Sequence, residues 1–483
     1  MHGLKDRFFE PLTKNELYLA HVASLEVLER TGVKIYATEA IELLRKGGCE
    51  VDTEKELVKI PQHLVKECIA KTPSTFTLCG RNKEWDLTFD SSKFFTGWAG
   101  GVPYIHDVET QQRREGKIQD VADTSRAIDA LSNIHFHLCP VVVPTDVPAK
   151  ALEVHSADAA LSNTVKHVEP EIWSKERIQD VIKIGEIVAG GEDELRKRPL
   201  ISGMSQAVAP LQQNELQLSI LMEFAKKGLP INIRAHPISG LSSPVTIAGE
   251  LVMTNAENLS SLVIAQLTNP RTPILYGMSS SVADMRVCLN LSGAVEIGLL
   301  GAAHVQMARY YGIPSSYSTA IDSPAPDAQA ATELIFTLMP GLLGGMSMAW
   351  LGANDLKSTF WYEQLLINED IFTNAQRLLK GIDLSDETLA VNLINEVGPG
   401  GGFLNKRHTM LYYEKEHVRP KLFFRAPWHE WEKAGMKYIH ARARERAREI
   451  LKSHQAPPLD RDIREEMRRV VKGADTQTQK ITL

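Results

Sequence analysis

Apolar residues follow two alternating patterns along most of the chain, and together these predict repeated strand-then-helix units. Short β-prone runs alternate with segments of helical spacing, such as Leu211–Lys227, Glu250–Leu267 and the Ala- and Gly-rich Ser292–Tyr311. The eight predicted strands are Phe94–Trp98, Ile134–Val143, His167–Ile172, Leu200–Gln206, Pro230–His236, Pro273–Met278, Pro314–Thr319 and Met346–Leu351. Eight such units close most naturally into a parallel (β/α)8 barrel, the TIM barrel. An open doubly wound sheet is the alternative, which the lack of a G-x-G-x-x-G motif after the first strand disfavours.

The two ends of the chain follow other patterns. Helical periodicity over Leu12–Arg30 and Thr38–Gly47 is followed by β-rich runs around Gly80-Arg81-Asn82, which predict a hairpin capping one end of the barrel. From His440 onward, charges alternate at helical spacing, which predicts a solvated helix packed on the barrel or on another subunit. We expect an N-terminal helical and hairpin subdomain at 1–90, a barrel at 91–412 and a C-terminal helical extension at 413–483.

Composition narrows the class of protein without changing this fold. A chain of 483 residues, 43% hydrophobic and 24% charged, can bury a large core, and its net charge of −6 offers no field for nucleic acid. The sequence has no apolar run of 18 residues and no signal-peptide core, so we expect a cytoplasmic protein with no membrane partner. Its five cysteines lack CxxC spacing, which argues against a disulfide framework or an iron–sulfur cluster.

A barrel of this kind carries its chemistry where the strands end and the following loops begin. The predicted candidates there are Trp98, Pro144, Thr145, Asp146, Gln206, Arg234, His236, Tyr276, Met278, Ser279, Thr319, Asp322 and Trp350. This set is rich in aromatic, amide and hydroxyl groups. It is poor in clustered carboxylates, so a metal site built on paired acids has little support.

The stretch Gly344–Leu366 concentrates aromatic residues around a turn-like Gly-Ala-Asn-Asp segment. It places Trp350 before the turn and Trp361 and Tyr362 after it. Electron-rich ring faces can surround a cation that has no hydrogen-bond donor. The plainer interpretation is that these rings pack a late strand against its helix.

A zinc site is a second possible chemistry. Strand alternation sends His135, His137 and Cys139 to one face, and an HxH pair on a barrel strand is similar to that of metal-dependent amidohydrolases. Such enzymes need further ligands, for which only His236 and Asp322 are obvious, so buried lining is the simpler interpretation. There is no G-x-S-x-G elbow, and the Gly-rich run Gly398–Phe403 is read as a structural turn.

Several segments resemble the trimethylamine methyltransferase family, and together they cover nearly the whole chain. They are residues 31–48, 244–286, 308–316, 326–330, 362–371, 397–409 and 419–425. Members of that family resemble one another as TIM barrels that move a methyl group from a methylated amine to the cobalt of a corrinoid on a separate protein. The best-known branch uses pyrrolysine. This chain has only the twenty ordinary residues, so it falls with relatives that resemble glycine betaine methyltransferases.

The chain departs from the family pattern at three places. Gly402 replaces a larger polar residue found in many relatives, Asn405–Arg407 is more basic than usual, and Gly352–Ser358 differs from the pyrrolysine members. The last departure counts against trimethylamine itself as the substrate.

The resemblance implies a reaction that needs little from the protein's own side chains. A quaternary ammonium leaves as a neutral tertiary amine, dimethylglycine in the case of glycine betaine, so no general acid is required. The nucleophile is the Co(I) of a corrinoid (cobalamin) carried by a partner protein, so no metal of the chain's own is needed. The implied homo-oligomer would bind a small-molecule quaternary amine and this corrinoid protein.

The resemblance also implies roles for particular residues. Aromatic faces from Trp98, Tyr276, Trp350 and Trp361 would form the cation cage. A substrate carboxylate would be received by Arg234 or His236, unless Arg234 is paired with an acid of the protein. Asp322 would lie near the ammonium, or else cap a helix. The residues Gly400, Gly401, Gly402 and His408 would help present the corrinoid. A metal-dependent amidohydrolase and a non-catalytic quaternary-amine binding protein are the alternatives.

Overall fold

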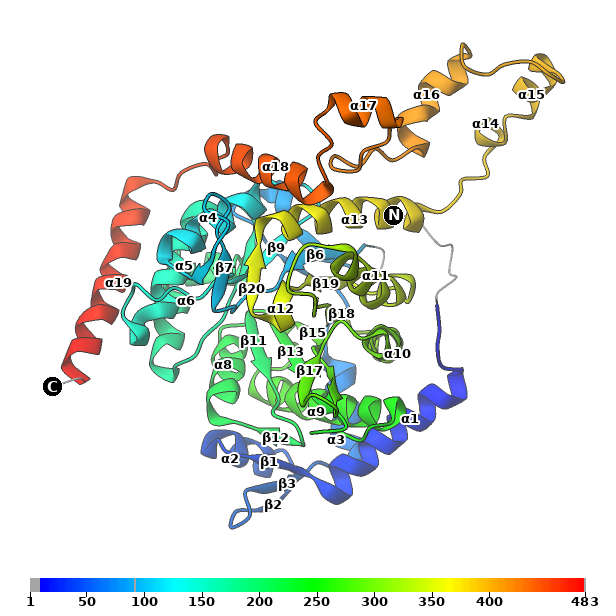
Figure 1. The fold of residues 1–483 in the computed structure, drawn as a ribbon. Helices are drawn as coiled ribbons and strands as arrows, with labels where there is room; N and C mark the ends of the chain where they lie inside the picture. The colour runs from blue at the N-terminus through cyan, green and yellow to red at the C-terminus, as the bar shows by residue number, and fades with distance from the viewer. Residues whose placement is uncertain (1–8, 91–92, 482–483) are drawn as a thin grey trace.

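Eight parallel strands form the barrel at the centre of the computed structural model, which describes residues 9–90 and 93–481 (Figure 1). The strands are β6 (Phe95–Trp98), β9 (Phe136–Cys139), β10 (His167–Pro170), β11 (Gly203–Gln206), β13 (Ile231–Ala235), β15 (Ile274–Met278), β18 (Ser315–Ser318) and β19 (Met348–Leu351). They pair in the order β10-β9-β6-β19-β18-β15-β13-β11, and a parallel bridge between Val168 and Ile201 joins the two edge strands. Every strand lies within a predicted run, so the TIM barrel is confirmed.

Helices surround the barrel on its outside (Figure 1). They are α4 (Ile118–Asp129), α5 (Leu152–Asn163), α6 (Ile178–Ala189), α7 (Glu192–Lys197), α8 (Glu215–Lys226), α9 (Ile247–Thr268), α10 (Val295–Tyr311), α11 (Ala328–Leu343) and α13 (Tyr362–Lys380). The side chains of Asn214 and Thr246 cap α8 and α9 by accepting hydrogen bonds from first-turn backbone amides. The helix predicted from Leu211 begins later, at Glu215, because Gln212–Gln213 forms β12, which pairs with an N-terminal strand.

The N-terminal helices pack on α9 at the outside of the barrel, and the hairpin that follows them covers the end where the barrel strands begin. Its elements are α1 (Lys14–Glu26), β1 (Val33–Ile35), α2 (Thr38–Lys46), β2 (Glu50–Asp52), β3 (Leu57–Lys59), α3 (Gln62–Lys71), β4 (Phe76–Leu78) and β5 (Leu87–Phe89). The last two form the predicted hairpin. Phe89 from this hairpin lies edge-on to Phe95, with ring centroids 5.2 Å apart, and shares an apolar cluster with Phe136 and Trp350. The hairpin therefore closes the end of the barrel where the strands begin.

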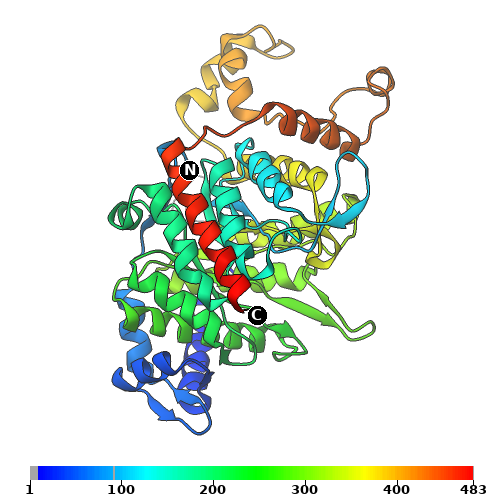
Figure 2. The ribbon, with the colours of Figure 1, turned by 90° about the vertical axis from the view of Figure 1, so that its left-hand side faces the viewer.

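The C-terminal region leaves the barrel and then returns to it (Figures 1 and 2). After α13 come α14 (Asp386–Leu389), α15 (Val391–Val397), α16 (Arg407–Glu416) and α17 (Trp428–Lys433), then α18 (Ile439–Ser453) and α19 (Arg461–Ile481). Residues 381–438, called the arm below, project away from the barrel. Helix α18 packs on α13 and α4, and α19 packs on α5 and α6. No helix in the described part of the chain has the length and apolar character needed to cross a membrane.

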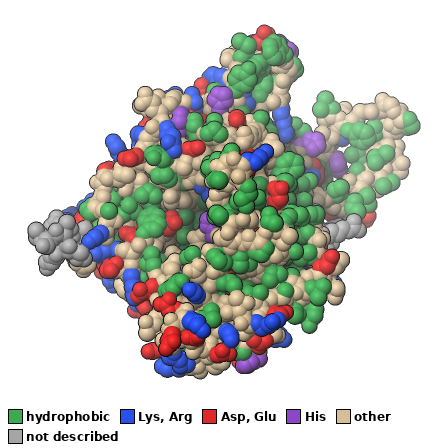
Figure 3. Space-filling view, turned by 60° about the horizontal axis from the view of Figure 1, so that its bottom comes forward, with side chains coloured by type: hydrophobic (Ala, Val, Ile, Leu, Met, Phe, Trp, Pro, Cys, Tyr) green, Lys and Arg blue, Asp and Glu red, His purple; other side chains and the backbone are tan. Residues whose placement is uncertain are grey.

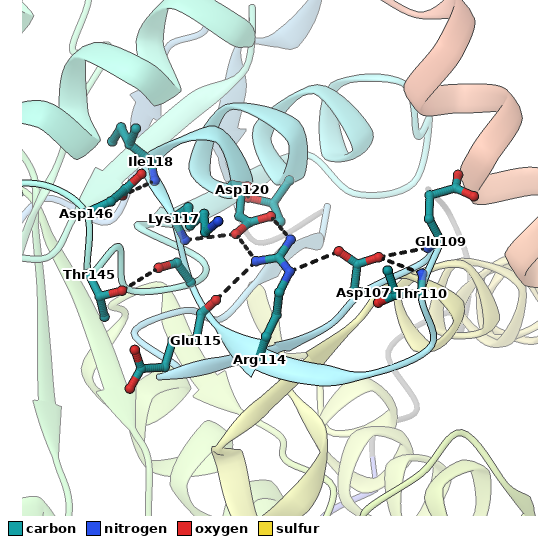
Figure 4. Close-up of polar contacts among 12 residues, drawn as sticks. Asp107, Glu109, Thr110, Arg114, Glu115, Lys117, Ile118, Asp120, Thr145 and Asp146 are labelled. Atoms are coloured by element: carbon teal, nitrogen blue, oxygen red, sulfur yellow. Dashed lines mark hydrogen bonds and ion pairs between the residues drawn. The ribbon is translucent and has the colours of Figure 1, made fainter.

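A three-stranded sheet stands at the carboxyl ends of the barrel strands. It consists of β7 (Tyr104–His106), β8 (Arg113–Glu115) and β20 (Thr359–Trp361), in the order β20-β7-β8. Arg114 anchors it by donating two hydrogen bonds to Asp120 at the start of α4, at 2.7 and 2.8 Å, and one to Asp107 at 2.9 Å (Figure 4). Burial opposes the ionisation of Asp107, but hydrogen bonds from Thr110, Arg114 and Glu109 lower its pKa to about 2.

The barrel interior depends on a glycine in its first strand. Alternate residues of a strand point inward, and Gly97 faces the ring of Phe136. A Cβ atom at Gly97 would lie 2.0 Å from Cε2 of Phe136, whose ring is edge-on to Trp350 with centroids 4.5 Å apart. Any larger residue at position 97 would therefore displace both aromatic rings.

We predict that Gly97→Ala lowers the free energy of unfolding by about 1–3 kcal/mol, because one methyl group overpacks the barrel interior. Urea denaturation would measure the change. The matched control is Gly402→Ala, since a Cβ atom there meets no heavy atom within 4 Å. The control is expected to shift stability by less than about 0.5 kcal/mol. Equal unfolding midpoints for the two variants would contradict the packing described here.

Candidate active site

A cavity of about 140 Å³ lies at the carboxyl ends of the barrel strands. It is smaller than the roughly 300 Å³ at which pockets for drug-sized molecules begin, so it suits a small ligand. Its lining consists of Ala99, Gly100, Val102, Leu138, Glu171, Met204, Gln206, Arg234, His236, Ser279, Ser318, Thr319, Gly352, Ala353 and Lys357. The position is the one where TIM barrels carry their chemistry. Five of the predicted strand-end candidates, among them Arg234 and His236, line it.

Strand parity decides which predicted residues reach this cavity. On β13, Arg234 points into the barrel, and His236, two residues further on, lines the same cavity. Trp98 has the opposite parity and packs edge-on against Phe360, with ring centroids 5.6 Å apart. A shift of one residue along a strand moves a side chain to the other face. Trp98 therefore lies outside the cavity, in contrast to the sequence-based expectation.

Tyr276 also faces outward, toward the helices. Its hydroxyl donates to the side-chain oxygen of Asn255 in α9 at 2.6 Å, and its ring stacks on His304 of α10 with centroids 5.3 Å apart. Like Trp98, it was expected at the site because it ends a strand. Its parity instead assigns it to the contact between the barrel and its helices.

Trp350 and Trp361 are both engaged with other side chains. The Trp350 ring points inward and is fully buried, with the guanidinium carbon of Arg234 4.7 Å from its centroid. Its face therefore already holds a cation of the protein. Trp361 stacks on His106 with centroids 3.5 Å apart. The four predicted cage aromatics thus do not gather around the described cavity.

Asp322 holds a loop and does not cap a helix, because the N-cap of α10 is Ala294, which follows the two amides that Asp322 binds. Its two carboxylate oxygens accept hydrogen bonds from the backbone amides of Ser292 and Gly293, each at 2.9 Å. Burial nevertheless raises its pKa, against these hydrogen bonds and the nearby Lys357. Asp322 therefore holds the loop before α10. Its negative charge also raises the pKa of Lys357.

Arg234 is paired with an acid of the protein. Its Nη2 lies 3.0 Å from Oε1 of Glu169, and both side chains are buried. Burial raises the pKa of Glu169 to about 7, although Arg234 and a hydrogen bond from Ser202 oppose the shift. Removing one partner of a buried ion pair costs about 3–5 kcal/mol, because the other charge is left uncompensated. Arg234 therefore lines the cavity as the partner of Glu169 and is not free to pair with a substrate carboxylate.

His236 presents an unused polar atom among the described residues. Its Nδ1 lies 2.6 Å from the amide nitrogen of Gln206, while its buried Nε2 has no hydrogen-bond partner. Burial, with Lys357 and Arg234, lowers the pKa of His236 to about 3, so the ring is neutral. Because the amide donates to Nδ1, the ring proton lies on Nε2. His236 therefore lines the cavity and carries a buried N–H donor that has no partner among the described residues.

Glu171 supplies the complementary unused atom. Its Oε2 is buried and has no hydrogen-bond partner among the described residues. Burial raises the pKa of Glu171 to about 7, with Arg234 opposing. Gly101 has φ +75°, and a Cβ atom there would lie 2.4 Å from Oε2, so this glycine leaves room for the carboxylate. Sequence reasoning missed Glu171, although its spacing of two from Glu169 at a strand end was a usable signal.

Lys357 reaches the cavity from a strained turn. Asp355, Leu356 and Lys357 have φ values of +58°, +52° and +67°, three successive left-handed residues without a glycine. Each costs about 1–2 kcal/mol relative to the right-handed form. The carboxylate of Asp355 stabilises the turn by accepting hydrogen bonds from Ser358 at 2.6 Å and Thr359 at 2.9 Å. Strain of this kind gathers at functional sites.

Lys357 lines the same cavity as Glu171 and His236. Burial lowers its pKa to about 8, while Asp322 raises it and Arg234 lowers it further. The group is thus held cationic near neutral pH in a poorly hydrated position. An anionic group on a ligand would relieve that unfavourable burial.

Two of the predicted zinc ligands, His137 and Cys139, point from β9 toward the outer helices, whereas His135 lies before the strand with its ring beside Thr96. Nε2 of His137 lies 3.0 Å from the Ser125 hydroxyl in α4, and Cys139 Sγ donates to the Ser156 carbonyl in α5 at 3.1 Å. Burial lowers the pKa of His137 to about 3. Among the residues that the structure describes, no group of three or more His, Cys, Asp or Glu side chains is arranged to hold a metal ion.

The residues expected to present the corrinoid lie on the arm. Gly400, Gly401 and Gly402 are exposed between α15 and α16, and His408 stacks on Tyr412 with centroids 4.5 Å apart. None of them lines the barrel cavity. The structure therefore separates this motif from the place where a small ligand would bind.

Comparison with known proteins identifies related methyltransferases. The family model described as trimethylamine methyltransferase (MTTB) matches residues 3–477. The trimethylamine methyltransferase MttB of Desulfitobacterium hafniense is 36% identical over 465 residues, covering 96% of this chain and 93% of that relative. The glycine betaine methyltransferase of Desulfitobacterium hafniense is 29% identical over 457 residues, covering 94% of each protein.

A solved structure shows the same fold. The monomethylamine methyltransferase MtmB of Methanosarcina barkeri gives a TM-score of 0.55 at 12% identity, covering 92% of this chain and 89% of that chain. At this identity the likeness shows the shared fold alone. The family match and the relatives above 30% identity extend over nearly all of the sequence, and this chain therefore belongs to the trimethylamine methyltransferase family.

Proposed function

We propose that this methyltransferase transfers a methyl group from a small zwitterionic quaternary amine, most simply glycine betaine, to the Co(I) of a corrinoid carried by a partner protein. The observation that carries the proposal is the pair of opposite charges at the cavity, where Glu171 offers an unpartnered carboxylate oxygen and Lys357 an ammonium. A betaine carries the complementary charges on one small molecule. The glycine betaine methyltransferase among the relatives supports the same substrate class.

The two ends of such a ligand find different partners. The substrate carboxylate would bind Lys357 and the Nε2–H donor of His236, while its quaternary ammonium would lie toward Glu171. Trimethylamine has no carboxylate, so it would leave Lys357 with only the nearby charge of Asp322 to offset its desolvation. Such a desolvated charge is costly, so the site discriminates against simple amines.

The chain's own residues bind and orient the substrate and exclude water. A quaternary amine departs as a neutral tertiary amine, so no side chain has to donate a proton to it. When the partner is docked, its Co(I) supplies the nucleophile. Gly, Ala and Ser make up six of the fifteen lining residues, so little side-chain bulk would surround a bound methyl group. Fixed orientation of the reacting atoms is then the main contribution of the protein.

The first prediction concerns the reaction itself. The protein is mixed with cob(I)alamin and, separately, with glycine betaine, proline betaine, carnitine, choline and trimethylamine, and formation of methylcobalamin is followed by absorbance. We expect the fastest transfer from a betaine and at least about tenfold slower transfer from choline and trimethylamine, since 1.4 kcal/mol of lost ion pairing is tenfold. Absence of methylcobalamin with every amine would defeat the proposal.

The second prediction tests the carboxylate partner. Lys357→Met removes the ammonium and keeps most of the apolar stem, so KM for glycine betaine should rise about 10- to 100-fold, as expected for losing a charged hydrogen bond. The KM for tetramethylammonium, which lacks a carboxylate, should stay within about twofold of wild type. The matched control is Lys83→Met, which removes an exposed lysine far from the cavity. An equal rise in KM for glycine betaine and for tetramethylammonium would mean that Lys357 supports the fold of the site and does not bind the carboxylate.

The third prediction is a pH profile with two limbs. Glu171, with pKa about 7, must lose its proton to attract the ammonium, so kcat/KM should rise with pH up to that value. Lys357, with pKa about 8, must keep its proton to hold the carboxylate, so kcat/KM should fall above that value. In Glu171→Gln the acid limb should disappear while the alkaline limb remains. An unchanged acid limb in that variant would assign it to another group.

A further inference from the structure

The arm, residues 381–438, is too poorly packed to be stable on its own. None of its four helices α14 to α17 has a buried residue, and Leu422 is the only buried residue described in the whole segment. Fifteen of its large apolar side chains are exposed, including Ile382 at 77%, Leu404 at 93% and Met410 at 73%. Figure 3 shows hydrophobic side chains crowding this projection.

The arm needs a partner that buries its exposed apolar surface, because folding it costs more free energy than its own packing returns. Ordering one residue costs about 1–2 kcal/mol of conformational entropy, and burial of apolar surface is the main term that offsets it. The exposed side chains of one arm amount to on the order of 1,000 Å² of apolar surface, taking about 150–250 Å² for a large ring. A patch of this size on a free protein is an aggregation hazard unless a partner covers it.

The same chain carries a second uncovered apolar surface. On α10, Val295 and Leu299 are 56% and 40% exposed, and on α11, Ile335 and Phe336 are 41% and 55% exposed. The two helices approach so closely that a Cβ atom at Gly298 would lie 2.1 Å from the Phe336 carbonyl oxygen. These four exposed side chains lie on two helices in close contact, and they are called the α10–α11 face here.

The balanced charge and large apolar surface of the arm favour an obligate partner over a transient one. The arm contains eight acidic and eight basic residues, so it carries no net charge that would attract an oppositely charged macromolecule. A protein that delivers and removes a corrinoid at each turnover must leave again, and transient interfaces are small and polar. Obligate interfaces are more apolar and bury about 2,000–5,000 Å². Two arms exchanged between two copies would reach that range.

We infer that the arm is the association element of this protein, and that the arm of one copy covers the α10–α11 face of a second copy. In a two-fold arrangement each copy gives one arm and receives one, so both uncovered apolar surfaces of the chain are buried at once. The inference goes beyond the proposed function, since it concerns how copies of the chain assemble. The chain alone, without amine or corrinoid, is sufficient to test it.

The test measures mass by sedimentation velocity and light scattering, with the full chain at micromolar concentration. Wild type should sediment as a dimer or a multiple of one. The arm double variant Ile382→Asp/Leu404→Asp and the face double variant Val295→Asp/Phe336→Asp should each weaken association at least about 100-fold and give monomers. The matched control, Leu241→Asp/Val245→Asp, alters two side chains that are each 72% exposed elsewhere and should keep the wild-type mass.

Folding of the variants is checked independently, because an unfolded variant would also lose its mass. Far-ultraviolet circular dichroism of each monomeric variant should match wild type, and amide hydrogen exchange in residues 382–411 should be protected in wild type and fast in both variants. A monomeric wild type would overturn the inference, including one that associates only when a corrinoid protein is added. Retention of the wild-type mass in the arm variant would overturn it equally.

Discussion

The buried ion pair between Arg234 and Glu169 is the interaction on which the site depends. It lies within the barrel, with the guanidinium over Trp350, so the charge is enclosed on several sides. Arg234 also opposes the upward pKa shift of Glu171 and lowers the pKa of Lys357. Burial is the main cause of both pKa shifts, and the fixed cation of Arg234 limits the first shift and adds to the second.

This constraint explains why the described residues form no aromatic cage at the cavity. The ring face best placed to hold a ligand cation, Trp350, is already occupied by the guanidinium of Arg234. Recognition of an ammonium then falls to the carboxylate of Glu171, and recognition of a carboxylate falls to Lys357 and the neutral ring of His236. A ligand that brings both charges relieves both buried groups, which a simple amine cannot do.

The sequence predicted the barrel well and the site only in part, for one physical reason. Parallel strands are buried on both faces, so they appear as continuous apolar runs that locate the strand but do not show which residues point inward. Trp98 and Tyr276 were therefore placed at the cavity, whereas their parity directs Trp98 toward Phe360 of β20 and Tyr276 toward the helices. Arg234 and His236 reached it. Three left-handed residues ending at Lys357 carry no glycine and so no local signal, and their position depends on contacts with distant strands.

The most direct measurement is a crystal structure of the protein with glycine betaine. We expect one molecule in the barrel-mouth cavity, with its carboxylate within hydrogen-bonding distance of Lys357 Nζ and His236 Nε2 and its trimethylammonium group toward Glu171. Betaine bound in the opposite orientation, or bound outside this cavity, would contradict the account.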